Sequence, residues 1–96
     1  MKVEVGSLWE NHGQYNINMT NVSGDLVEGW TIKITFSKAI ESVEGWNGVF
    51  EYSGNVLTIT PDADWNRSIS AGASHNSTGF SVEITGDFKI DGVEVY

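Results

Sequence analysis

Apolar and polar residues alternate strictly along residues 28–36, which read E-G-W-T-I-K-I-T-F. One side of this stretch carries large apolar side chains, namely Trp30, Ile32, Ile34 and Phe36. Strict alternation is typical of a β-strand that has one face in a core and the other face in water. Four such side chains are enough to anchor a core, so we predict a structural role for Trp30.

The same alternation recurs in short stretches that are separated by turn residues. We predict further strands at residues 2–5, 14–21, 49–52, 56–60, 78–85, 88–90 and 93–95, and a weakly patterned segment at 40–45. Residues 22–25, 53–55, 86–87 and 91–92 have turn chemistry. No stretch has helical periodicity. The sequence therefore predicts an all-β fold, an antiparallel β-sandwich of the immunoglobulin-like or jelly-roll type with about eight or nine short strands in two sheets.

Length and charge narrow the functional classes. The chain has 96 residues, which predicts one domain over residues 1–96, and it has no cysteine, so the core must hold the fold without disulfides. The formal net charge of −8 argues against a nucleic acid or an anionic membrane as partner, because both require a basic face. No apolar run approaches the roughly 18 residues of a membrane span, and no signal peptide is visible after Met1.

Three tryptophans lie outside the alternating pattern and need another explanation. Trp9 and Trp65 stand in predicted polar loops, and Trp46 is bracketed by Gly45 and Gly48. Each of these tryptophans could cover an end of the sandwich and close the core. Three tryptophans outside the core pattern of one small acidic domain instead favour an exposed aromatic cluster that binds a ligand. A pyranose ring suits an indole because its C–H face stacks on the π-face while its hydroxyls stay in water. Burying ~100 Å² of each indole contributes about 2.5 kcal/mol.

Several motifs, in this order and spacing, carry a family resemblance. They are E-G-W-T-I-K-I-T-F, V-E-G-W, S-G-N-V-L-T-I-T, W-N-R-S-I-S-A-G and T-G-F, and they span residues 5–85. The sequence resembles family 2 carbohydrate-binding modules, which are cellulose- or xylan-binding β-sandwiches attached to bacterial glycoside hydrolases. The resemblance implies that Trp9, Trp46 and Trp65 form one flat face, as in the cellulose-binding branch.

The resemblance also implies polar partners for the sugar hydroxyls. Asn16 and Asn76 match amide positions of the family, and Glu44 stands where the family usually has glutamine. The alternation independently turns Asn16 outward. Two features depart from the family pattern: the disulfide is absent, and His12 replaces the glycine of the cellulose binders or the arginine of the xylan binders. An arginine there turns the preceding tryptophan out of plane, so His12 is expected to influence the orientation of Trp9.

We therefore expect a non-catalytic, monomeric module that binds cellulose or a related β-1,4-linked polysaccharide and was part of a larger secreted protein with a catalytic or scaffold module. The alternatives are a module for xylan or another soluble glycan, an adhesive sandwich that uses the aromatic cluster for protein contact, and an enzyme. No cofactor and no metal are expected. Residues 62–66 begin like a calcium loop, but Arg67 and Ala73 occupy the positions that require Gly and Glu.

Overall fold

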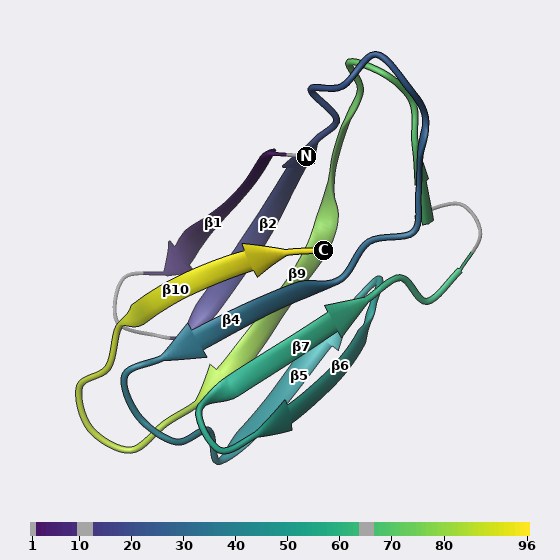
Figure 1. Cartoon of the computed structure of the whole chain (residues 1–96). Helices are drawn as coiled ribbons and strands as arrows, with labels where there is room; N and C mark the ends of the chain where they lie inside the picture. Colours follow the sequence, from purple (N-terminus) through teal and green to yellow (C-terminus); the bar gives the residue numbers. More distant parts are fainter. Residues whose placement is uncertain (1, 10–12, 64–66) are drawn as a thin grey trace.

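The computed structural model describes residues 2–9, 13–63 and 67–96, with the backbone alone for residues 7–9. Its strands form two four-stranded antiparallel sheets and one short pair (Figure 1). The first sheet has the order β1 (Lys2–Trp9), β2 (Gln14–Thr20), β9 (Ser74–Glu83) and β5 (Ser42–Trp46). The second sheet has the order β10 (Ile90–Val95), β4 (Ile32–Phe36), β7 (Val56–Thr60) and β6 (Val49–Ser53), and β3 (Val27–Glu28) pairs with β8 (Ser68–Ile69).

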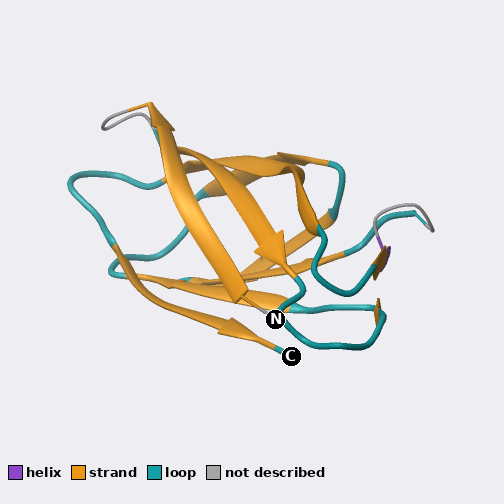
Figure 2. Ribbon diagram, turned by 90° about the horizontal axis from the view of Figure 1, so that it is seen from above, coloured by secondary structure: helices purple, strands orange, loops and turns teal. Residues whose placement is uncertain are grey.

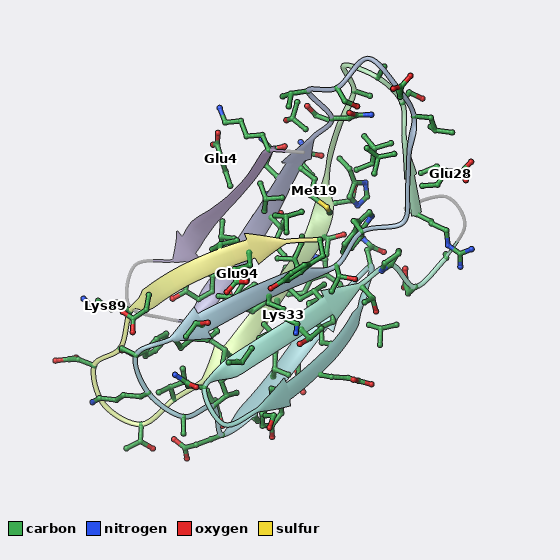
Figure 3. All side chains as sticks on the ribbon, in the orientation of Figure 1. Glu4, Met19, Glu28, Lys33, Lys89 and Glu94 are labelled. Carbon is green, nitrogen blue, oxygen red and sulfur yellow. The ribbon has the colours of Figure 1, made fainter. Side chains whose placement is uncertain are left out.

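The two sheets face each other as two layers, which confirms the predicted antiparallel β-sandwich (Figure 2). Met19 is fully buried in the core, whereas the side chain of Glu4 is exposed and points away from β1 (Figure 3). The extents of the chain are 42 × 21 × 19 Å, so the sandwich is elongated. The β3-β8 pair lies at one end of the long axis, where Figure 3 places Glu28.

The core follows the alternation of the sequence. Every second residue of β4 and β7 in the second sheet is buried, namely Ile32, Ile34, Phe36, Leu57 and Ile59. The first sheet contributes the buried side chains of Ile17, Met19, Phe80 and Val82. Phe36 of the second sheet meets Phe80 of the first edge to face, with ring centroids 6.4 Å apart and an interplanar angle of 84°. This is the geometry that aromatic rings prefer in a packed core.

The predicted strand at residues 28–36 is wrong in its first half. Gly29 has a φ of 84°, a left-handed conformation that ends the pairing of β3, and β4 starts three residues later. The first half is nevertheless tied down, because the Gly29 amide donates to the Arg67 carbonyl and Thr31 exchanges two backbone bonds with Tyr96. Trp30 is 4% exposed and packs in the core, so its predicted structural role is confirmed.

Other boundaries also differ from the prediction. β1 continues to Trp9 where a loop was expected, and β9 begins at Ser74, four residues earlier than predicted. The expected turn at residues 91–92 is instead a β-bulge inside the single strand β10, where the register with β4 shifts between Ile90 and Gly92. A bulge and a turn both use residues such as Asp and Gly, which is why the sequence did not separate them.

A buried asparagine, Asn21, holds the end of the sandwich that carries β3 and β8. Its side chain is 0% exposed, and its amide nitrogen donates to the carbonyls of Asp25 and Ile69 at 2.7 and 2.8 Å. Its side-chain oxygen accepts from the amide and the hydroxyl of Ser23. Buried polar groups are stable only when they are satisfied in this way. Asn21 therefore fixes the turn after β2 against β8.

Candidate functional site

The candidate site is the outer face of the first sheet. Backbone register places Gly6, Asn16, Gly79 and Trp46 side by side across its four strands, in one rung. A second rung lies two residues further along β2, β9 and β5. It contains Gln14, Ser81 and Glu44, and the backbone of Trp9 in β1 is opposite Gln14. Outward residues of neighbouring strands share one face of a sheet, so both rungs belong to the same surface.

Trp46 is the last residue of β5, although it lies outside the alternating pattern of the sequence. Its indole is 40% exposed and lies over Gly79, its rung partner. Indole atoms Cζ2 and Cε2 are 2.5 and 2.7 Å from where a Cβ on Gly79 would sit, so only glycine leaves the space. The partly covered ring presents the rest of its surface to solvent.

Gly45 explains why the sequence pattern did not predict β5 correctly. Gly45 points inward, between the outward residues Glu44 and Trp46, and a Cβ at Gly45 would overlap the ring of Phe50. Phe50 comes from β6 in the second sheet and fills the position that an inward side chain of β5 would occupy. Phe50 of the second sheet therefore fills the space in the core that an apolar side chain at position 45 would otherwise fill.

The structure brings three of the predicted site residues together. Asn16 is in the same rung as Trp46, two interstrand spacings away, which corresponds to about 10 Å between the Cα atoms. Glu44 precedes Trp46 by two residues on the same face, about 7 Å along β5. Glu44 is exposed and lines a shallow hollow of ≈ 280 Å³ with Ser42, Ser81 and Glu83.

The other predicted residues have different outcomes. Asn76 is exposed in β9, three residues before Gly79 and on the side of the Trp46 rung opposite to Glu44. Trp65 and His12 lie outside the described residues, as does the side chain of Trp9. The roles of all six predicted residues in binding stay predictions.

Three residues of this face were not singled out from the sequence: Gln14, Gly79 and Ser81. Gln14 has the same outward parity as Asn16, so the alternation around Tyr15 was a signal that could have found it. Gly79 gave no such signal, because its importance depends on the indole that arrives from another strand. Ser81 follows from its position between buried Phe80 and Val82.

The ionisable groups of the described residues suggest no catalytic pair. Burial raises the pKa of Tyr15 and lowers the pKa of His75. Among the described residues, no group of three or more His, Asp and Glu side chains is arranged to hold a metal ion. No helix in the described part of the chain is long and apolar enough to cross a membrane.

An antiparallel sandwich with an indole and hydrogen-bonding side chains on an open sheet face has the features that we expect of a non-catalytic carbohydrate-binding module. The comparison with known families agrees with this class. The chain matches the cellulose binding domain family over residues 1–94 and belongs to this family, the family 2 carbohydrate-binding modules of glycoside hydrolases. The resemblance noted from the sequence is thus confirmed. A module of this family binds polysaccharide and performs no catalysis itself.

The chain spans less than a fifth of the length of two of the proteins that it matches. The chain is 30% identical over 81 residues to endoglucanase A of Thermobispora bispora, an alignment that covers 84% of this chain and 17% of that enzyme. Chitinase ChiA74 from Bacillus thuringiensis superimposes with a TM-score of 0.61 at 21% identity, over 99% of this chain and 14% of the chitinase. ChBD2 from Thermococcus kodakarensis KOD1 gives a TM-score of 0.53 at 20% identity, over 99% of this chain and 84% of ChBD2. The two structural matches support the fold.

Proposed function

We propose that the chain binds cellulose through the outer face of the first sheet. Trp46 stacks on a pyranose ring, and Trp9 and Trp65 provide two further indoles of the same face. Asn16, Glu44 and Asn76 exchange hydrogen bonds with the sugar hydroxyls. The supporting observation is Trp46 itself, an exposed indole laid over Gly79 in the same rung as Asn16.

The shape of the face favours an extended polymer over a small, enclosed ligand. Gly6 and Gly79 flank Asn16 in the Trp46 rung, and the only side chain over Gly79 that the described residues show is the Trp46 indole, so no bulky side chain of Gly6 or Gly79 interrupts this rung. The backbone of Trp9 lies at one edge and Trp46 at the other, three interstrand spacings or about 14 Å apart across the sheet. A sugar chain crossing the strands would meet both edges and the amides between them.

Two comparisons also support cellulose as the proposed ligand: the matching family is described as a cellulose binding domain, and one relative is an endoglucanase. We further propose that residues 1–96 act as one monomeric module of a longer extracellular protein and bring an attached catalytic or scaffold module to plant cell-wall polysaccharide. Three stacked indoles contribute about 7 kcal/mol before association costs of several kcal/mol, with hydrogen bonds adding the rest. The expected dissociation constant is on the order of micromolar.

Retention on microcrystalline cellulose tests this proposal. We expect the chain to bind at high salt, because stacking and hydrogen bonds between neutral groups are little screened. Soluble cello-oligosaccharides should compete. Parallel incubations with insoluble xylan distinguish cellulose binding from xylan binding. A xylan-binding module would be retained more strongly on xylan than on cellulose. Absence of retention on every polysaccharide would contradict the proposal and favour the protein-contact alternative.

A further inference from the structure

The turn between β5 and β6 has an unusual backbone at the residue after Trp46. Among the described residues, Asn47 is the one non-glycine residue with a positive φ, 58°. Side chains other than glycine rarely adopt this left-handed conformation, although asparagine tolerates it better than most. Such a conformation persists when the surrounding structure holds it in place. The contacts of Asn47 show what holds it.

Two hydrogen bonds tie Asn47 to consecutive residues of β9. The side-chain amide of Asn47 donates to the Ser77 carbonyl at 2.7 Å, and the Thr78 hydroxyl donates to the Asn47 carbonyl at 2.9 Å. Ser77 lies in a bulge of β9, where the register with β2 shifts opposite the segment between Ile17 and Met19. A bulge leaves one residue without a ladder partner. The Asn47 side chain supplies a partner for the bulged strand there.

His75 extends this pair of bonds by one residue. Its Nε2 is 2.9 Å from Oγ1 of Thr78, whose single proton is already given to the Asn47 carbonyl. The Thr78 oxygen must therefore accept from Nε2–H of His75. Thr78 is 0% exposed, so the bonds that it makes are shielded from water. Burial also lowers the pKa of His75, in keeping with a neutral ring that carries its proton on Nε2.

The same segment of β9 receives the indole. Gly79 directly follows Thr78, and it is the residue over which atoms Cζ2 and Cε2 of Trp46 lie. Residues 77–79 of β9 thus hold the backbone of Asn47 by hydrogen bonds and, at Gly79, leave the space that the Trp46 side chain fills. The direction in which the Trp46 side chain leaves the sheet edge depends on the peptide that Asn47 anchors.

We propose that Thr78, supported by His75 and Asn47, is a positioning residue that holds the Trp46 indole over Gly79 and thereby sets the affinity for a β-1,4-linked glucan. The part of this inference that concerns affinity rests on the proposed function. Holding the ring before the ligand arrives removes the cost of ordering a large side chain during binding. None of the three residues needs to contact the sugar for this effect.

Two substitutions at Thr78 separate positioning from ordinary packing. Thr78→Val keeps the shape and removes the hydroxyl, and Thr78→Ser keeps the hydroxyl and removes a methyl group. In each free protein we would measure the nuclear Overhauser effect between the Trp46 Hζ2 proton and the Gly79 Hα protons. We would then measure affinity for cellohexaose, with Trp46→Ala as the reference for complete loss of the ring.

We expect Thr78→Val to lose most of the Trp46–Gly79 signal and to bind cellohexaose about 5- to 20-fold more weakly, the size of effect that ordering one side chain has. Thr78→Ser should keep the signal and bind within about twofold of the parent protein. An unchanged signal in Thr78→Val would overturn the positioning role. A lost signal with unchanged affinity would overturn its link to binding, provided that Trp46→Ala weakens binding in the same assay.

A second variant covers the case in which Thr78→Val does not fold. Asn47→Gly keeps the left-handed backbone and the bond from Thr78, and removes the side-chain bond to Ser77. We expect a weaker Trp46–Gly79 signal here too, and an unchanged signal would contradict the inference. If Trp46→Ala binds cellohexaose as well as the parent protein, the proposed function fails, and the signal in the free proteins still decides the positioning role.

Discussion

Replacing Trp46 by alanine removes the one indole of the candidate face whose side chain the structure describes. The ring is 40% exposed, which for a large aromatic side chain corresponds to about 100 Å². A sugar ring that covered all of this area would contribute ~2.5 kcal/mol, and one that covered less than half would contribute about 1 kcal/mol. We therefore expect Trp46→Ala to weaken cellulose binding roughly 5- to 70-fold.

Depletion isotherms on microcrystalline cellulose measure this change, and two variants serve as controls. Tyr96 is 66% exposed and follows β10 in the second sheet, where its ring lies 5.5 Å from the Lys33 ammonium. Tyr96→Ala removes a more exposed aromatic ring from the other sheet and should leave binding unchanged. Trp30→Ala should cost about 3–5 kcal/mol of unfolding free energy because Trp30 is a core residue.

Trp46→Ala itself should cost less stability, about 1–2 kcal/mol for the contacts that the indole loses over Gly79. If folded Trp46→Ala bound cellulose as tightly as the parent protein, the Trp46 indole would not stack on the sugar. If Tyr96→Ala lost as much affinity as Trp46→Ala, binding would not be specific to the first sheet.

The remaining predictions concern stability and pH. Asn21→Ala should cost about 2–4 kcal/mol in denaturant titrations because it removes the donor to the buried Ile69 carbonyl, whereas Asn18→Ala, at an exposed position of the preceding strand β2, should stay within about 0.5 kcal/mol. Gly45→Ala should cost about 1–3 kcal/mol through overlap with Phe50, and Phe50→Leu should restore part of this in a double-mutant cycle. Because burial lowers the pKa of His75 in the folded state, the unfolded chain binds more protons as pH falls through and below 6.5, so the unfolding free energy should decrease over that range. His75→Gln should show a shallower decrease, and an identical pH dependence would count against that contribution.

Much of the fold follows from the sequence because the core obeys simple alternation. The inward residues of β2, β4 and β7 are those that the pattern of apolar residues selects, and all are buried except Tyr15, which is half-buried. The prediction fails where a position is decided by a distant part of the chain. Gly45 interrupts the alternation of β5 because Phe50 from the other sheet occupies its place.

The predicted site shows the same limit. The spacing of Asn16 and Trp46 gives no hint that register makes them rung partners on either side of Gly79. The positioning contacts of Asn47 were also hidden, because their partners Ser77 and Thr78 are about 30 residues away in the chain and lie in a bulge that no local pattern marks. Long-range register is a property of the packed sheets, and only the structure contains it.

Backbone amide shifts during titration with cellohexaose will show which sheet binds the glucan. If the outer face of the first sheet binds the glucan, the largest shifts will occur at Asn16, Gly79 and Trp46, including the Trp46 indole N–H. Amides of Lys33 and Thr58 in the second sheet will stay unchanged, because their side chains face the opposite side of the sandwich. Shifts concentrated at Lys33 and Thr58, or no shifts at the first sheet with ligand in excess, would contradict the account.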